Sequence, residues 1–425
     1  MHKYVSGFNS LGSLLNKLTK TSVFKQLSWY TLAQIIVQVV AFLSAVIVSR
    51  YLGPSNLGLY SFVQNYVASF LTIVAGMDFY FVWKLAKSED LYKDVHTFIG
   101  HKLNIYLIII LAGLSSAWII LPRDVALMVS IVLIPVFLQS LSVFSLYTAV
   151  VRQAKLLSFV QVFSSVSLLI AKIILVFLKA PLYSFIIVAA VDLILSGVIF
   201  YLHYSKDPLW REVFSRKHFP SFINSLSFLF SIRLSIIALA CWQLLLRADQ
   251  LILAAVSNAY TLGIYSAAVK VAEVPNFFAG VLSTVLISRI AHVSTNADDI
   301  SKDKLKKMML IFLGAGCCIA LGVIILAPLA IHILYGSKFN DAIPVLRVYA
   351  LSIPGMFMNY FFLGMYGARD KHHYQVAIFG TALIVNIILV YILTPVFGLI
   401  GTALATATAY SISALGFYIN IEDKK

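Results

Sequence analysis

The chain has 425 residues, of which 61% are hydrophobic and 12% charged, and its mean hydropathy is +0.93. Soluble globular domains are about 45–50% apolar and about 25% charged, so this composition excludes a water-soluble enzyme or binding domain. The net charge of +15 does not indicate nucleic-acid binding, because the basic residues lie in short segments between apolar runs instead of on one solvated face.

The first 26 residues carry apolar side chains at helical spacing, with lysines between them. Val5, Phe8 and Leu11 begin the pattern, and Leu15 and Leu18 continue it. The pattern predicts a helix at 1–26 that lies on the cytoplasmic membrane surface, and not a cleavable signal peptide. A tail without regular structure is the alternative interpretation.

Apolar runs long enough to cross the hydrocarbon core, which takes about 20 residues, follow along the rest of the chain. They lie at 27–50, 58–83, 103–121, 125–150, 157–178, 182–203, 226–256, 262–288, 308–334, 343–367, 374–394 and 398–420. Because a chain in lipid must satisfy its own backbone hydrogen bonds, these runs predict an all-α membrane protein with about 12 transmembrane helices.

The positions of the 32 lysines and arginines orient these helices. When the N-terminus is placed inside the cell, most of the basic residues fall in inside segments. The outer segments then carry only Arg50, Arg123, Lys179 and Lys338. Since cytoplasmic loops are enriched in lysine and arginine, both termini are expected in the cytoplasm.

The spans divide the chain into a first lobe at 27–203, an inter-lobe linker at 204–221, a second lobe at 222–420 and a cytoplasmic tail at 421–425. No segment outside the spans is long enough to form a catalytic domain with its own core. The three cysteines, Cys241, Cys317 and Cys318, lie in apolar runs without metal-ligand spacing. We therefore expect a protein that is not an enzyme and holds no metal or cofactor.

An internal repeat relates the two predicted lobes. Residues 57–61, LGLYS, open the second span, and residues 262–266, LGIYS, open the eighth at an offset of 205 residues. The same offset pairs Gln38 with Gln243. Each half has an even number of spans, so the sequence predicts two parallel six-helix lobes around a central cavity.

Nine ionisable residues lie well inside the predicted spans. They are Lys172, Arg233, Arg247, Lys270, Arg347, Asp78, Asp192, Asp249 and Glu273. If all of them faced lipid, the cost would be on the order of 25 kcal/mol, which exceeds the roughly 5–15 kcal/mol by which folded proteins are stable. Most of these side chains must therefore pair with one another or face a hydrated cavity.

Helical spacing predicts which of the charged side chains lie together. Lys270 and Glu273 share a face of the eighth span, which Asn276 extends, so an ion pair between them is one interpretation. Arg233 and Arg247 are four turns apart on the seventh span and are expected on one face.

Other partners remain open for several of these charges. Asp192 is an alternative partner for the two arginines of the seventh span, and Lys84 for Asp78. Lys172 and Arg347 lie close enough to the outer surface for their side chains to reach it.

Neutral polar side chains occupy the corresponding part of the first lobe. Tyr30, Gln34 and Gln38 form a stripe at i, i+4 spacing on the first span. At the repeat offset, Phe42 and Asn65 stand where the second lobe has Arg247 and Lys270. The predicted cavity is therefore more basic on one side than on the other.

Four stretches of the chain resemble polysaccharide transporters related to O-antigen flippases. They are SRYLGP with LGLY at 49–60, LRAD with GIYSAA at 246–268, residues 364–371, and PVFG with GTALAT at 395–406. The chain is thereby identified as a member of the O-antigen flippase (Wzx-like) family. The multidrug/oligosaccharidyl-lipid/polysaccharide exporter superfamily, to which this family belongs, also holds multidrug exporters and lipid II flippases.

The resemblance implies two lobes around a V-shaped cavity, alternating access and a bacterial inner-membrane location. The implied cargo is an undecaprenyl-diphosphate-linked oligosaccharide, the repeat unit of O-antigen lipopolysaccharide, capsule or exopolysaccharide. Polysaccharide polymerase and assembly proteins are the implied partners, and nucleic acid is not. The alternatives are a multidrug or organic-cation antiporter, for which an acidic cavity is expected, and, less favoured, a membrane glycan polymerase or ligase.

This cargo assigns a role to each candidate residue. Arginine suits bidentate phosphate contacts and lysine acts as a point charge, so cavity cations are expected to bind the diphosphate or an acidic glycan. The cation candidates are Arg233, Arg247, Lys270 and Lys172. The polar and aromatic cavity candidates are Tyr30, Gln34, Gln38, Asn65 and Gln243. The candidates for binding a coupling H⁺ or Na⁺, or for neutralising the cations, are Asp78, Asp249 and Glu273.

Overall fold

The computed structural model describes residues 22–85, 88–151, 153–207, 210, 219–283, 302–369 and 371–422, and these are helical apart from short turns. Residues 1–21 of the predicted surface helix at 1–26, most of the linker at 204–221 and most of the tail at 421–425 lie outside them. The α-helices are α2 (Ser22–Leu85), α3 (Leu91–Ile120), α4 (Arg123–Leu133), α5 (Val143–Val150), α6 (Ala154–Phe177), α7 (Leu182–Tyr204), α9 (Phe222–Ser231), α10 (Arg233–Leu245), α11 (Ala248–Val256), α12 (Ala259–Glu273), α14 (Lys302–Leu334), α15 (Ala342–Tyr349), α16 (Ile353–Ala368) and α17 (His372–Glu422). Three short 3₁₀ helices are η1 (Ile134–Ser142), η2 (Ser337–Phe339) and η3 (Ala350–Ser352).

The helices α2 and α17 each contain a sharp reversal at a glycine. Gly53 has φ 70° and Gly398 has φ 58°, values that residues with a side chain rarely adopt. At 64 residues, a straight α2 would extend about 96 Å at 1.5 Å per residue. That length is about three times the hydrocarbon thickness of a bilayer. Each of these helices is therefore long enough for two crossings, one on each side of its glycine, as the predicted spans at 27–50 and 58–83 and at 374–394 and 398–420 require.

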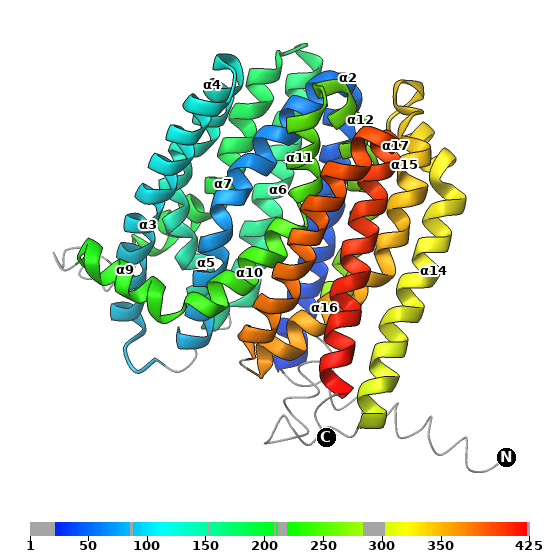
Figure 1. Cartoon of the computed structure of the whole chain (residues 1–425). Coiled ribbons are helices and arrows are strands. Elements are labelled where there is room, and N and C mark those ends of the chain that lie inside the picture. The colour runs from blue at the N-terminus through cyan, green and yellow to red at the C-terminus, as the bar shows by residue number, and fades with distance from the viewer. Residues whose placement is uncertain are drawn as a thin grey trace.

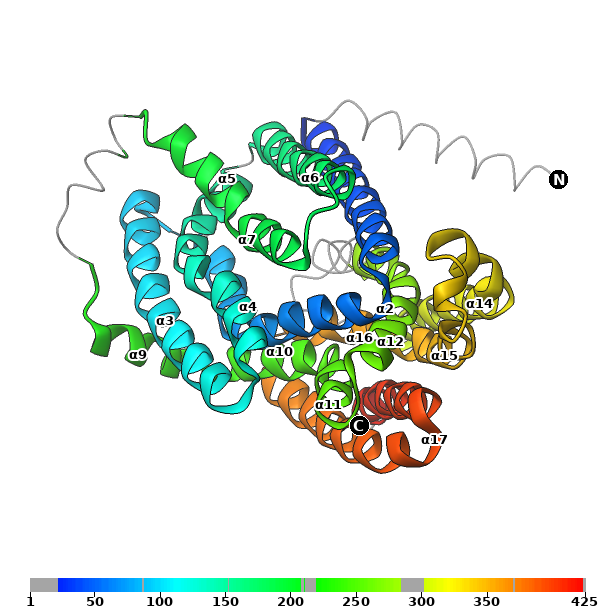
Figure 2. The same ribbon diagram turned by 90° about the horizontal axis from the view of Figure 1, so that it is seen from above.

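The fold is that of an all-α membrane protein, as the sequence predicts. In the part of the chain that the structure describes, eight helices are long and apolar enough to cross a membrane, or nine if the bent pair α9 and α10 forms one span. Figures 1 and 2 place α3 to α7 on one side and α14 to α17 on the other, with α2, α10 and α12 between them. The twelve-span count and the cytoplasmic location of both termini remain predictions.

The molecule has two distinct ends. The first turn of α2 and the last turn of α17 lie at one end, which we call the terminal end (Figure 1). The reversals at Gly53 and Gly398 lie at the opposite end, which we call the glycine-turn end.

The two repeats meet in a close contact near the glycine-turn end. A Cβ atom built on Gly58 would overlap the carbonyl oxygen of Ala259 and lie 3.0 Å from the backbone nitrogen of Gly263. Reciprocally, a Cβ atom on Gly263 would overlap the carbonyl oxygen of Pro54 and lie 3.0 Å from the nitrogen of Gly58. Gly263 lies at the repeat offset from Gly58, and Ala259 lies at the same offset from Pro54, so the contact is pseudo-symmetric. Glycine allows α2 and α12 to pack backbone against backbone here.

The predicted seventh span is not one straight helix. The helices α9 and α10 meet at 75° because Ile232, at φ −108° and ψ 16°, leaves the helical conformation. The first of them is bound to α3, where Asn104 donates hydrogen bonds to the Pro220 carbonyl (3.1 Å) and to the Ser225 hydroxyl (2.9 Å). His101 Nδ1 lies 3.0 Å from the same hydroxyl. The chain thus packs on the first lobe before it enters the second.

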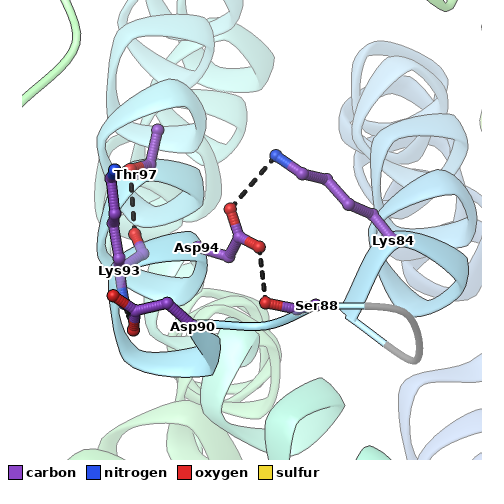
Figure 3. A network of polar contacts seen from close by, with 6 residues as sticks. All are labelled: Lys84, Ser88, Asp90, Lys93, Asp94 and Thr97. Atoms are coloured by element: carbon purple, nitrogen blue, oxygen red, sulfur yellow. Dashed lines mark hydrogen bonds and ion pairs between the residues drawn. The ribbon is translucent and has the colours of Figure 1, made fainter.

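A buried ion pair joins α2 to α3. Lys102 Nζ lies 2.7 Å from Asp78 Oδ1 and donates to the Ser142 hydroxyl at 2.9 Å, and the lysine side chain is fully buried. The sequence leaves Lys84 open as a partner of Asp78, and the structure shows that Asp78 pairs with Lys102. Lys84 instead pairs with Asp94 at 3.2 Å, within the polar network that connects α2 to α3 (Figure 3).

Replacing Lys102 by methionine is expected to destabilise the protein by about 3 kcal/mol, because the Asp78 carboxylate then loses its only described counter-charge. Lys84→Met is the matched control, since it breaks a more exposed ion pair worth about 1 kcal/mol or less. Thermal unfolding of the two purified variants in detergent measures the difference. Equal unfolding temperatures for the two variants would show that the buried pair adds nothing.

Candidate functional site: a cavity between the lobes

A cavity of about 710 Å³ lies between the first half of α2 and the α11–α12 region. It extends from Asn65 and Gln250 to Tyr30, which is 39% exposed and lies near the terminal end of α2. The lining residues are Tyr30, Thr31, Gln34, Gln38, Ala41, Phe42, Ala45, Asn65, Leu246, Arg247, Gln250, Lys270, Glu273, Val274, Asn276, Phe277, Gly280, Val281 and Tyr360. Its size is in the range of small-molecule binding sites.

The wall formed by α2 is neutral and polar. Tyr30, Gln34, Gln38 and Ala45 face the cavity because residues three to four apart share one face of a helix. Gln34 Nε2 donates to Gln161 Oε1 on α6 at 2.8 Å, which fixes the position of this amide.

The opposite wall carries the charges of the cavity. Arg247 directly precedes α11, and its Nη1 donates to the carbonyl oxygen (2.9 Å) and to Oε1 (2.7 Å) of Gln243. Lys270 and Glu273 lie in the last turn of α12. In the described part of the chain, no carboxylate lies within 4.0 Å of Arg247 or of Lys270. The direct Lys270–Glu273 ion pair that their spacing allows is therefore not formed.

A hydrogen-bonded junction connects the two walls at the deep end of the cavity. Asn65 Nδ2 on α2 donates to Gln250 Oε1 on α11 at 3.0 Å, and the Ser266 hydroxyl on α12 donates to the same oxygen at 3.0 Å. Between this junction and the glycine-turn end, Gly58 and Gly263 hold α2 against α12. The cavity is thus closed toward the glycine-turn end.

Seven of the twelve candidate residues line this cavity. They are Tyr30, Gln34, Gln38, Asn65, Arg247, Lys270 and Glu273. An eighth, Gln243, is not a lining residue, but it accepts both hydrogen bonds from the Arg247 guanidinium.

The expectation that Arg233 shares a face with Arg247 and lines the cavity is wrong. It assumes one straight helix, whereas the chain bends by 75° at Ile232 and α10 ends before Arg247. Arg233 is exposed; its guanidinium donates to the Phe230 carbonyl at 2.9 Å and lies 4.3 Å from the centre of the Phe230 ring.

Three further candidates also lie outside the cavity. Lys172 Nζ lies 3.7 Å from Asp192 Oδ2, and Asp78 is paired with Lys102. Asp249 is fully buried in the second lobe.

The carboxylate of Asp249 is bound entirely by hydrogen-bond donors. Its Oδ2 accepts from the Tyr265 hydroxyl at 2.6 Å and from the Thr406 hydroxyl at 3.1 Å, while its Oδ1 accepts from the backbone N–H of Gln250 at 2.7 Å. Among the described residues, no lysine, arginine or histidine nitrogen lies within 4.0 Å of it. This arrangement holds an unpaired carboxylate directly behind the cavity wall.

Gln250 and Tyr360 line the cavity but are not among the sequence candidates. The repeat could have identified Gln250, because it stands at the offset from Ala45, another lining residue. Ala41 with Leu246, Phe42 with Arg247, and Asn65 with Lys270 follow the same rule. We find no sequence signal for Tyr360.

The apolar helices form a membrane-protein bundle around a polar cavity that is closed toward one end. Residues 23–294 match the model of the family described as "Polysaccharide biosynthesis protein". The chain belongs to this family, which confirms the resemblance seen in its sequence. No curated protein sequence matches the chain.

Solved structures that the chain resembles in fold include a lipid II flippase and multidrug resistance transporters. The lipid II flippase MurJ in an inward closed conformation has a TM-score of 0.68 at 17% identity, over 92% of this chain and 87% of that chain. An inward-facing multidrug resistance transporter of the MATE family, in the MOP superfamily, has a TM-score of 0.69 at 13% identity, over 91% and 94%. A mutant of the Vibrio cholerae MATE transporter VcmN has a TM-score of 0.60 at 14% identity, over 94% and 97%.

Proposed function

We propose that this protein moves an anionic, lipid-linked oligosaccharide across the bacterial inner membrane by alternating access. The cargo in this proposal is a repeat unit of O-antigen, capsule or exopolysaccharide on undecaprenyl diphosphate. The observation that carries the proposal is that Arg247 and Lys270 line the cavity without a carboxylate within 4.0 Å in the described residues. Unpaired cations inside a membrane are costly, so their retention in a cavity favours an anionic ligand.

The cavity suits each part of such a cargo. Arg247 and Lys270 supply phosphate-binding groups, and amides such as Gln34 and Gln38 both donate and accept hydrogen bonds, as sugar hydroxyls require. The polyprenyl tail stays in the lipid. If the terminal end faces the cytoplasm, the observed form is the one that loads cargo, because the cavity is closed toward the opposite end.

The main alternative is a multidrug or organic-cation antiporter, whose fold is the same. Such a transporter requires a cavity that attracts cations. Here the charged lining residues are Arg247, Lys270 and Glu273, which leave an excess of positive charge. The charge of the cavity therefore favours the anionic cargo.

Deleting the gene is expected to leave undecaprenyl-linked repeat units on the cytoplasmic leaflet, since their synthesis continues without export. Extraction of the lipid-linked glycans and their analysis by mass spectrometry, with and without a plasmid-borne copy of the gene, measures this accumulation. Normal surface glycan and no accumulated intermediate in the deletion strain would refute the proposed function.

We further propose that the Asp249 carboxylate binds the coupling H⁺ or Na⁺. Asp249→Asn retains an oxygen that accepts from Tyr265 and Thr406 but removes the charge that a cation requires. Transport by this variant in vesicles is expected to lose its dependence on an ion gradient, whereas Asp124→Asn, at an exposed position, is expected to keep it. Glu273→Gln tests the second candidate carboxylate in the same assay. Full gradient dependence in both variants would exclude both carboxylates.

A further inference from the structure

The two walls of the cavity differ in chemistry at related positions. Every charged lining residue belongs to the segment from Arg247 to Glu273, whereas α2 contributes hydroxyl, amide, aromatic and alanine side chains. Phe42 and Asn65 occupy the repeat positions of Arg247 and Lys270, and all four line the cavity. The asymmetry therefore lies in the side chains, since the backbone positions are equivalent.

This asymmetry separates two kinds of ligand group. A diphosphate is bound most strongly by guanidinium and ammonium groups, through charge-assisted hydrogen bonds. Neutral hydroxyl groups are bound by amides, which both donate and accept, and sugar rings pack on aromatic side chains such as Tyr30. A cargo that carries both groups is therefore bound in one orientation.

The polar side chains of the α2 wall form a row that runs along the helix toward the terminal end. Gln38 and Gln34 lie about 6 Å and 12 Å closer to the terminal end than Phe42, at 1.5 Å per residue. The hydrogen bond of Gln34 to Gln161 fixes one amide of this row before any ligand arrives. A wall that is positioned in advance loses less side-chain entropy on binding.

We propose that Tyr30, Gln34 and Gln38 on α2 form the glycan-recognition surface and determine which glycan is exported, while Arg247 and Lys270 bind the diphosphate that all such cargoes share. This inference rests on the proposed function and deepens it. It predicts that substitutions on the α2 wall change binding of the glycan, which varies between cargoes. Substitutions of Arg247 and Lys270 should change binding of the diphosphate, which all cargoes share.

The test compares two ligands on the full-length protein in nanodiscs. One is the lipid-linked glycan extracted from the deletion strain, and the other is undecaprenyl diphosphate without sugar. Loss of two neutral hydrogen bonds, each worth about 0.5–1.5 kcal/mol, is expected to weaken binding of the glycan-bearing ligand to the Gln34→Ala/Gln38→Ala variant by roughly 5- to 150-fold. Binding of the bare diphosphate should stay within about twofold of the unsubstituted protein, because no group that contacts it is removed. The Arg247→Ala substitution should weaken the binding of both ligands by similar factors.

The control variant is Gln153→Ala, an exposed glutamine outside the cavity, which should bind both ligands as the unsubstituted protein does. If the Gln34→Ala/Gln38→Ala variant binds both ligands more weakly by the same factor, or binds both as tightly as the unsubstituted protein, the assignment of the glycan to α2 is overturned while the proposed function stands. If no lipid-linked glycan accumulates in the deletion strain, or the unsubstituted protein binds neither ligand, the proposed function fails and the assignment fails with it.

Discussion

Replacing Arg247 by alanine is expected to reduce glycan export by roughly 10- to 150-fold, the equivalent of one charge-assisted interaction of about 1.5–3 kcal/mol. The guanidinium is fixed by Gln243 at the cavity wall and has no described carboxylate partner within 4.0 Å. Its removal therefore takes away a phosphate-binding group without breaking an ion pair within 4.0 Å. Surface glycan of the deletion strain complemented with each variant, at equal amounts of membrane protein, measures the effect.

Arg233→Ala is the matched control for this prediction. Arg233 belongs to the same predicted span but is exposed outside the cavity, so its replacement is expected to leave export within about twofold of normal. The Arg247→Lys variant should export more glycan than Arg247→Ala but less than the unsubstituted protein, because lysine keeps the charge but cannot form bidentate hydrogen bonds. Equal export by the two alanine variants would show that the cavity position of Arg247 has no role.

Replacing Gly58 by alanine is expected to prevent closure of the glycine-turn end and to abolish most export. The new Cβ atom would overlap the carbonyl oxygen of Ala259 and approach the backbone of Gly263, and neither backbone can move aside as a side chain can. Overpacking of this kind typically costs about 1–3 kcal/mol. The equilibrium between the closed and the open form of the glycine-turn end is therefore expected to shift roughly 5- to 150-fold toward the open form, in which α2 and α12 separate. Gly263→Ala should behave alike, because its contact with Pro54 is the reciprocal one.

Accessibility of a single cysteine distinguishes this shift from misfolding. Ser61 is 2% exposed beside the contact, so a cysteine placed there should react with a membrane-impermeant maleimide in the Gly58→Ala protein and be protected in the parent. The three native cysteines are replaced in both proteins. The matched control is Gly314→Ala, whose Cβ atom would meet no atom within 4 Å. Equal labelling and equal export in the two glycine variants would refute a closure that depends on Gly58.

Features that follow from local sequence were predictable. Apolar runs identify helices because each crossing needs a continuous apolar stretch. The repeat at residues 57–61 and 262–266 marks the site where the lobes meet, and it relates lining residues such as Asn65 and Lys270. The Tyr30–Gln34–Gln38 stripe lies on the cavity wall because it depends only on the period of one helix.

Features that depend on distant contacts or on an unmarked break were not predictable. The bend at Ile232 has no proline or glycine to signal it, so the sequence predicts a straight helix and the wrong orientation for Arg233. Lys102 follows His101 and resembles a loop residue, and only the packing of α3 on α2 brings it to Asp78. Tyr360 reaches the cavity from α16, a helix whose position the sequence does not specify.

Translocation in proteoliposomes tests most directly whether cations in the inter-lobe cavity carry an anionic lipid-linked glycan. The purified protein is reconstituted with lipid-linked glycan extracted from the deletion strain, and the fraction of glycan accessible to an external glycosidase is followed over time. We expect the unsubstituted protein and Arg233→Ala to move the glycan between leaflets, and Arg247→Ala/Lys270→Ala to leave it on its original side. Movement at the same rate by the double variant, or none by the unsubstituted protein, would contradict the account.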